Sequence, residues 1–160
     1  MMDGPSLVGA LEECGITHVI WIPDSELGTW DKALSSTRHI QLIRVCREGE
    51  AMALAAGLIL GGKKPLLIMQ CTGFFEAGDS FRNIVHDLKL PLFLVVGLRS
   101  YHAFKRQGTR DSCPVFAEPV IQAWQIRYLL LENNQAAAEL ANAYRKAQAE
   151  NHPMIVLVAE

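Results

Sequence analysis

Short apolar runs alternate with segments of helical spacing along the whole chain, which predicts strands and helices in turn. Several of the apolar runs contain almost no polar residue, as is typical of strands that are covered on both faces. The predicted strands are His18–Ile22, Ile40–Cys46, Leu66–Cys71, Leu92–Gly97, Ile126–Leu131 and Met154–Ala159.

The segments between these runs predict helices. The predicted helices are Pro5–Cys14, Glu26–Leu34, Glu48–Leu60, Asp79–Leu88, Val115–Trp124 and Gln135–Glu150. Gly15 follows the first as a helix-ending glycine, and Asn134 precedes the last as its N-cap. Strands that alternate with helices indicate right-handed crossovers and parallel pairing. We therefore expect an α/β fold, a three-layer sandwich with a mainly parallel sheet of about six strands.

The composition is that of a globular protein, and we expect one domain over residues 1–160. The formal net charge of −2 offers no general attraction to nucleic acid. The four cysteines form no CxxC pair, which fits a reduced protein. No leader sequence opens the chain, and no apolar run approaches the ~20 residues of a membrane span. We expect a cytoplasmic protein without membrane contact.

Four segments follow predicted strands and are candidates for a ligand site, because ligands of parallel α/β sheets gather beyond the carboxyl ends of the strands. They are residues 23–26, 47–50, 72–79 and 98–113. We expect all four to be loops, and the last of them shows no clear element. A loop of about 16 residues in a compact domain is usually functional or mobile.

Several common motifs are incomplete or absent. Gly57–Lys64 nearly matches a phosphate-binding loop, but Lys64 replaces the hydroxyl residue that should hold Mg²⁺, and the glycines end a helix. No GxGxxG motif follows a strand, and no GxSxG motif occurs. The five histidines include no i, i+4 pair, so we expect no metal site in this chain. Cys71 is either a nucleophile at a strand end or a small buried residue.

Two acids, Glu48 and Glu50, open the helix predicted over Glu48–Leu60. Acids are stabilised in a first helical turn by the partial positive charge of the helix N-terminus. The remainder of this helix is small and apolar, so its next turns should be buried and should carry one carboxylate toward the interior. The pattern leaves two interpretations open: acids that only start a helix, or a carboxylate placed for chemistry.

A series of short motifs gives the chain a resemblance to one enzyme family. The motifs are Ile22-Pro23-Asp24-Ser25, Arg47-Glu48-Gly49-Glu50-Ala51, Ala55-Ala56-Gly57, Gly62-Lys63-Lys64-Pro65, Met69-Gln70-Cys71-Thr72-Gly73, Pro91–Arg99 and Gln107-Gly108. Together they resemble the pyrimidine-binding domain of thiamine-diphosphate-dependent enzymes over most of the chain. The resemblance looks closest to the alpha subunit of sulfopyruvate decarboxylase and to the matching part of phosphonopyruvate decarboxylase.

The resemblance implies roles for three residues in cofactor binding. The family's glutamate lies nine residues before a helix glycine, which is the spacing of Glu48 to Gly57, whereas Glu50 is closer. Glu48 would therefore hydrogen-bond the aminopyrimidine of thiamine diphosphate and activate the cofactor. Thr72 and Gly73 would be further cofactor-binding residues.

The resemblance also implies a partner. In the family a separate domain holds the diphosphate and Mg²⁺ through a GDG motif, which this sequence lacks. A beta-type subunit that binds Mg²⁺ would then complete the site, in a hetero-oligomer with self-association. The small residues Ala51, Ala55 and Ala56 either suit the close approach of that subunit or pack tightly on the chain's own sheet.

The implied substrate residues lie in the segments after the strands. They are Asp24, Ser25, Phe74, Arg99 and Gln107, with His102 as a catalytic proton relay. Asp24 and Ser25 are equally suited to cap the next helix, and His102 is equally compatible with a surface position. Cations at positions 99, 102, 105, 106 and 110 either bind an anionic substrate group or form a solvated loop.

The sequence departs from the resemblance at Phe74, Phe75 and Glu76, where phosphonopyruvate decarboxylase carries small and amide side chains. Two aromatic residues there suggest a more apolar or bulkier pocket, and Glu76 would repel a second anionic group. The function that the resemblance implies is decarboxylation of a small 2-oxo acid. A carboligase or synthase that shares the same intermediate, a non-catalytic regulatory subunit and a flavodoxin-like protein acting alone are the alternatives.

Overall fold

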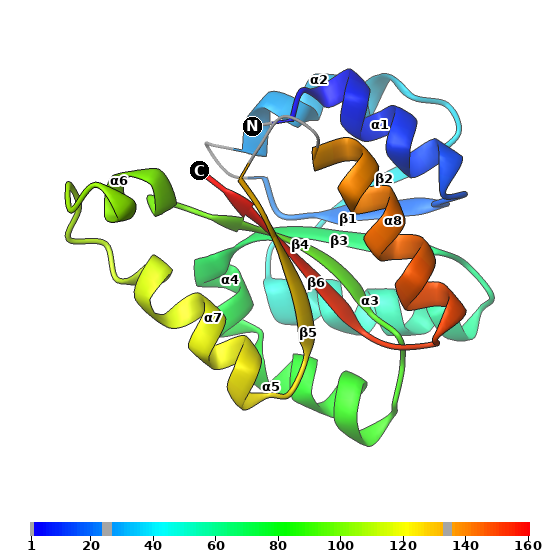
Figure 1. Cartoon of the computed structure of the whole chain (residues 1–160). Coiled ribbons are helices and arrows are strands. Elements are labelled where there is room, and N and C mark those ends of the chain that lie inside the picture. Colours follow the sequence, from blue (N-terminus) through cyan, green and yellow to red (C-terminus); the bar gives the residue numbers. More distant parts are fainter. Residues whose placement is uncertain (1, 24–26, 133–135) are drawn as a thin grey trace.

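A computed structural model describes residues 2–23, 27–132 and 136–160 and shows one sheet of six parallel strands, in the order β2-β1-β3-β4-β6-β5 (Figure 1). The strands are β1 His18–Trp21, β2 Gln41–Arg44, β3 Pro65–Gln70, β4 Phe93–Leu98, β5 Arg127–Leu131 and β6 Met154–Ala159. Each predicted strand is confirmed to within one or two residues at either end. The four strands that read as continuous apolar runs, β1, β3, β4 and β6, form the centre of the sheet, where both faces are covered.

Helices connect the strands. They are α1 Gly4–Glu13, α2 Asp31–Ser36, α3 Glu48–Leu60, α4 Cys71–Glu76, α5 Gly78–Arg82, α6 Tyr101–Lys105, α7 Cys113–Ala123 and α8 Ala136–Ala149, with a 3₁₀ turn at Leu27–Trp30 and a π turn at Asn83–Asp87. α3 has the predicted bounds, and Gly15 ends α1 with a φ of 68°. The expected N-cap Asn134 and the expected helix start Glu26 lie outside the described residues. None of the described helices is long and apolar enough to cross a membrane.

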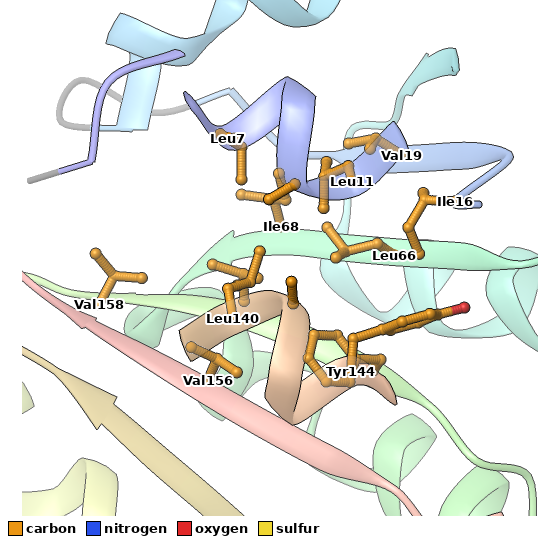
Figure 2. Packing of buried hydrophobic residues seen from close by; sticks show 14 of the residues in the cluster. Leu7, Leu11, Ile16, Val19, Leu66, Ile68, Leu140, Tyr144, Val156 and Val158 are labelled. Atoms are coloured by element: carbon orange, nitrogen blue, oxygen red, sulfur yellow. The ribbon is translucent and has the colours of Figure 1, made fainter. Parts of the chain in front are cut away.

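The helices cover the sheet on both faces, which gives the expected three layers (Figure 1). α1, α2 and α8 pack on one face, and α3, α4, α5 and α7 on the other. Figure 2 shows the first of these layers, in which side chains of α1 and α8 meet those of β3 and β6: Leu7, Leu11, Leu140 and Tyr144 with Leu66, Ile68, Val156 and Val158. Each fully buried leucine there stabilises the fold by about 1.5–3 kcal/mol.

Two segments that we expected to be loops contain helices. Residues 72–79 hold most of α4, which follows β3 without a connecting residue and so carries no turn signal. Residues 98–113 hold α6, a five-residue helix fixed by the buried Tyr101 side chain and by a hydrogen bond from His102 N to Glu160 O of 3.0 Å. The helix expected over Asp79–Leu88 is divided between α5 and the π turn.

The small residues of α3 have a role within the chain. Ala51 and Ala55 are completely buried and Ala56 is 7% exposed, in a cluster with Ile20 and Leu67 of the sheet. Of the two interpretations, tight packing of helix on sheet is therefore correct, and contact with a partner subunit through these three side chains is wrong.

Candidate functional site

The order in which successive strands are added to the sheet reverses between β1 and β3. β1 connects outward to the edge strand β2, and the chain then returns to place β3 on the other side of β1. Such a switch point leaves a crevice beyond the carboxyl ends of the strands, because the following segments diverge. α3 begins after β2 and α4 after β3, and these two helices contact each other across the end of β1.

Glu48, the first residue of α3, lies directly against Gly73 of α4. A Cβ atom at position 73 would overlap Cγ, Cδ and Oε1 of Glu48. Any residue other than glycine at position 73 would therefore displace the Glu48 side chain. The structure thus brings two of the predicted site residues into contact from segments 25 positions apart.

Glu76 holds the start of α3 to the end of α4. Arg47 Nη2 donates to Glu76 Oε1 at 2.7 Å, and the backbone N–H of Gly49 donates to Glu76 Oε2 at 3.4 Å. The hydrogen bond from Arg47 lowers the pKa of Glu76. The negative charge of Glu76 is therefore compensated by Arg47 and by the N-terminus of α3. Glu76 consequently repels an anionic substrate less than an unpaired acid would.

Glu48 and Glu50 differ in their surroundings. Glu48 is half-buried, whereas Glu50 points to solvent. Neither a hydrogen bond nor a salt bridge ties the Glu48 carboxylate to another residue in the described part of the chain. Glu48 is therefore a partly buried carboxylate that lies against Gly73 and has free hydrogen-bonding capacity at the switch point of the sheet.

Thr72 completes this corner of the site. Its side chain is exposed, and its hydroxyl donates to Oε1 of Gln70 at 3.1 Å. Gly73, the next residue, is buried against Glu48.

Asp111 organises the neighbouring segment after β4. Its carboxylate accepts from Arg99 Nε at 2.6 Å, Ser100 Oγ at 3.0 Å and the backbone N–H of Cys113 at 3.0 Å. The pKa of Asp111 is lowered to about 2, chiefly by the N–H of Cys113 and further by Arg99 and Ser100. Ser100 adopts a left-handed φ of 61°. Arg99 is thereby held in one orientation at the strand end.

Cys71 lies beneath this segment and joins it to β3. The side chain is completely buried, and burial raises the pKa of its thiol to about 12, with the neighbouring Cys113 thiol adding to the effect. The backbone N–H of Arg99 donates to the same thiol. A thiol with this pKa is protonated at neutral pH, so of the two interpretations Cys71 is a small buried residue.

α6 projects from the sheet beyond the end of β4 (Figure 1). Its base is fixed by Tyr101, whose hydroxyl donates to Glu132 Oε1 at 2.6 Å, which raises the pKa of Tyr101 to about 12. His102 is exposed, with its ring edge-on to Tyr101 at 5.8 Å. Gln107 follows α6 with a φ of 55° and is exposed.

Phe74 is not available to a substrate. Its side chain is completely buried and packs edge-on against Phe81 at 5.4 Å and Trp124 at 5.3 Å. The expected contact of Phe74 with substrate is therefore wrong, because α4 turns this side chain toward the core. Phe75 instead faces an apolar groove of about 520 Å³ between α4 and α7, lined also by Thr72, Cys113, Phe116, Val120 and Trp124.

Glu48, Thr72 and Gly73 are therefore brought together, and Arg99 lies at the adjacent strand end. His102 and Gln107 lie on and after the projecting α6, whereas Asp24 and Ser25 lie outside the described residues. The sequence did not reveal the roles of Arg47, Glu76 and Asp111. For Asp111 the sequence did carry a signal. Asp111-Ser112 precedes Cys113 and Pro114, a pattern that resembles the cap of a helix.

Comparison with known proteins gives relatives but no family model that matches the chain. The chain is 30% identical to sulfopyruvate decarboxylase subunit alpha of Methanococcus maripaludis over 90 residues, 56% of this chain and 54% of that protein. Identity to the same subunit of Methanocaldococcus jannaschii is 26% over 99 residues, 62% and 59% of the two chains. Phosphonopyruvate decarboxylase of Streptomyces viridochromogenes is 29% identical over 111 residues, 69% of this chain and 27% of that protein.

These matches confirm the resemblance inferred from the motifs. The chain is similar to alpha subunits of sulfopyruvate decarboxylase and to phosphonopyruvate decarboxylase. The matched region spans a little over half the length of the sulfopyruvate decarboxylase subunits and about a quarter of the phosphonopyruvate decarboxylase.

Proposed function

We propose that this chain is a single pyrimidine-binding domain, and that it acts as one subunit of a two-chain, thiamine-diphosphate-dependent decarboxylase of small 2-oxo acids. The observation that carries the proposal is the Glu48 carboxylate, fixed against Gly73 at the switch point of the sheet without a hydrogen-bonding partner among the described residues. The similarity to sulfopyruvate and phosphonopyruvate decarboxylases gives the reaction class.

The residues at this corner fit the aminopyrimidine of the cofactor. A flat heterocycle that hydrogen-bonds Glu48 needs a neighbourhood of small side chains, and the glycine at position 73 and the exposed Thr72 are such neighbours. Glu48 would hold the proton that is shared with a ring nitrogen, and its partial burial strengthens such a hydrogen bond. When bound, the cofactor supplies an electron sink for the carbon–carbon bond that breaks as CO₂ leaves.

The other half of the cofactor site would belong to a beta-type partner. This sequence has no GDG motif. We therefore assign the diphosphate and Mg²⁺ to the partner subunit. The name "subunit alpha" of two relatives supports such an arrangement.

The substrate side would be formed by the segment after β4. Arg99 is oriented by Asp111, so its guanidinium is presented in a fixed geometry suited to a carboxylate or a second anionic group. Lys105, Arg106 and Arg110 add positive charge along α6 and beyond. His102 remains a candidate for proton transfer, and Gln107 for a substrate hydrogen bond.

The structure gives less support to a non-catalytic subunit than the sequence does. The features that favoured it were Phe74, Phe75 and Glu76, which differ from the small residues of the relatives. Phe74 lies in the core, and Glu76 is paired with Arg47, so these two changes leave the surface beside Glu48 and Gly73 open. A carboligase would use the same residues and differ only in what reacts after CO₂ has left.

The test is a substrate screen on the co-purified pair. The gene for a neighbouring chain that carries GDG would be co-expressed, and CO₂ release measured with sulfopyruvate, phosphonopyruvate and pyruvate. We expect release only with both chains present, and faster release with an anionic second group. Acceptor aldehydes added to the same assay would reveal a carboligase by a new carbon–carbon product. Cofactor binding without turnover of any 2-oxo acid would contradict a decarboxylase.

A further inference from the structure

The amino ends of three neighbouring strands meet at a pocket. β4, β6 and β5 lie side by side, and the first residues of β4 and β5, Phe93 and Arg127, both pair with Met154, the first residue of β6. A pocket of about 220 Å³ lies beside these strand starts, between the π turn and the segments that precede β5 and β6. Glu48 lies at the carboxyl ends of the strands, so this pocket is separate from the candidate site.

The polar residues of this pocket are cationic or neutral. They are exposed, and they are His86, Lys89, Gln125, Asn151 and His152. No acid is among the residues that line the pocket, all of which belong to the described part of the chain. Ammonium, imidazolium and amide N–H groups are hydrogen-bond donors, and the charged ones bind oxyanions strongly. The pocket therefore has the donor set of an anion site.

The acids nearest to this pocket have arginine partners. The carboxylate of Asp87 accepts from Arg82 Nη1 at 2.9 Å. Glu150 is paired with Arg127, although its charge also reaches His152. Among the described residues, neither acid forms a salt bridge with a cation that lines the pocket. The positive charge of the pocket is therefore not cancelled by a direct ion pair.

Three of the polar side chains are carried by left-handed residues. Lys89, Gln125 and Asn151 have φ values of 55°, 56° and 48°, and they follow the π turn, α7 and α8. α1 and α3 instead end with glycines in this conformation, Gly15 with a φ of 68° and Gly62 with a φ of 74°. Glycine adopts this backbone without steric cost, whereas a residue with a Cβ atom does not. Side chains at three such strained positions that line one pocket indicate a function for that pocket.

The turns that carry these side chains are closed by backbone hydrogen bonds. The N–H of Ile126 donates to Ile121 O at 3.2 Å, and the N–H of His152 donates to Ala147 O at 3.0 Å. These bonds satisfy carbonyl groups at the ends of α7 and α8, as in the Schellman motif. The negative end of a helix dipole explains a nearby lysine or histidine without any ligand, but it does not explain the two amide side chains.

We propose that this pocket binds a small tetrahedral oxyanion, a phosphate ion or the phosphate group of a short-chain molecule, between Lys89, His86 and His152, with the two amides as further donors. The volume lies below the about 300–1,000 Å³ of most ligand pockets, so the occupant is small. Because the donors are exposed, we expect a dissociation constant of about 1 mM. This site goes beyond the proposed function and does not depend on it.

Titration of the full chain with inorganic phosphate tests the site, followed by ¹H–¹⁵N NMR at constant ionic strength and at about pH 6, where histidine side chains carry charge. We expect saturating shifts of the amides at the five polar positions of the pocket. Glycerol phosphate, titrated in the same way, distinguishes the two sources of the anion. An ester whose carbon chain contacts the apolar residues Val85, Ile126 and Pro153 should bind at least about threefold more tightly than the free ion. Equal or weaker binding of the ester would assign the pocket to the free ion.

Removal of one charge tests the cationic donors. Lys89→Gln and His152→Gln should each raise the dissociation constant for phosphate at least about threefold, because each removes a charge-assisted hydrogen bond. Lys63→Gln is the matched control. Lys63 is exposed and follows the left-handed Gly62, as His152 follows Asn151, but it does not line the pocket. Its dissociation constant should stay within about twofold of the wild-type value.

Glycine at the two amide positions separates binding from stability. The double variant Gln125→Gly, Asn151→Gly should keep or raise the midpoint of thermal unfolding, because glycine fits the left-handed backbone. It should nevertheless raise the dissociation constant at least about threefold, because two donors are lost. Shifts that do not saturate up to about 50 mM phosphate would overturn the proposal. So would an equal loss of affinity in Lys63→Gln, or wild-type affinity in the double glycine variant.

Discussion

At the scale of the residue, the contact between Glu48 and Gly73 explains why a glycine is needed at the start of α4. The carboxylate occupies the volume where any β-carbon would lie. The first-turn acid of α3 is therefore held by a steric fit rather than by an ion pair. The neighbouring acid Glu76 has the opposite character, since its carboxylate is engaged by Arg47 and Gly49.

Gly73→Ala should displace the Glu48 side chain. We expect a loss of about 1–3 kcal/mol in the free energy of unfolding from the overlap. A displacement of this size should also slow the reaction of the two-chain complex about 100-fold. Urea unfolding and the CO₂ assay measure the two effects.

Gly9→Ala is the matched control for that variant. A Cβ at position 9 of α1 meets no atom within 4 Å, so this change should stabilise the protein by about 0.5–1 kcal/mol through helix propensity. If Gly73→Ala behaved like Gly9→Ala, the contact with Glu48 would not constrain the site.

Asp111 should make stability depend on pH in the acid range. Its pKa is about 2 in the folded chain, against a usual value of 3.8, so the folded state favours the ionised form. The resulting stability is fully present above about pH 4 and is lost as the pH falls toward 2. Between pH 4 and pH 2, the free energy of unfolding should fall by about 1–2 kcal/mol less in Asp111→Asn than in the wild type. Urea unfolding at pH 7, 4 and 2.5 measures the slope; an unchanged slope would mean that the carboxylate is not held by Cys113, Arg99 and Ser100.

At the scale of the element, α4 shows where the sequence was misleading. Residues 72–79 follow a predicted strand and include Thr72 and Gly73, so they were expected to be a loop that presents Phe74 to a substrate. The helix instead begins at the last residue of the predicted strand and turns Phe74 into a cluster with Phe81 and Trp124. No capping residue precedes it, since Gln70 makes no side-chain cap hydrogen bond.

Phe74→Ala tests this placement. Loss of a fully buried aromatic side chain should lower the free energy of unfolding by about 3–5 kcal/mol. Phe74→Leu should cost less, because most of the volume is retained. The preference among 2-oxo acids should be the same in the leucine variant as in the wild type. A leucine variant of normal stability with a changed substrate preference would show that Phe74 contacts the substrate.

Long apolar runs and the ends of α1 and α3 were predictable because their signals are local. Buried parallel strands read as continuous apolar sequence, and Gly15 marks a helix end through its φ of 68°. The network around Asp111 was not predictable, since it depends on how residues 99–113 fold back on themselves over 12 positions. The pairing of Arg47 with Glu76 likewise joins segments 29 positions apart.

At the scale of the whole molecule, one edge of the sheet carries the candidate chemistry. This edge arises from the switch between β1 and β3, which places α3 beside α4. The N-terminus of α3 supplies the Glu48 carboxylate, which lies against Gly73.

The three tyrosines should remain un-ionised until the fold is lost. The pKa of Tyr101 is raised to about 12 by Glu132, that of Tyr144 to about 12 by burial, and that of Tyr128 is raised by Glu118. Since the folded state favours the neutral phenols, this stability is present below the usual pKa of 10 and is lost as the pH rises toward 12. Absorbance near 295 nm should show no tyrosine ionising at the usual pKa of 10 and should rise only at higher pH, together with unfolding followed by circular dichroism. A tyrosine that ionised near pH 10 in the folded chain would contradict these environments.

The most direct test of the central claim is exchange of the cofactor's C2 proton with deuterium, followed by NMR in the complex of this chain with its GDG-bearing partner. We predict that Glu48→Gln leaves cofactor binding intact and slows exchange at least about 100-fold. Glu139→Gln, which changes a first-turn acid of α8 in the opposite layer, should leave the exchange rate unchanged. If the Glu48→Gln complex binds the cofactor and exchanges at the wild-type rate, Glu48 only starts a helix, and the proposed catalytic role is wrong.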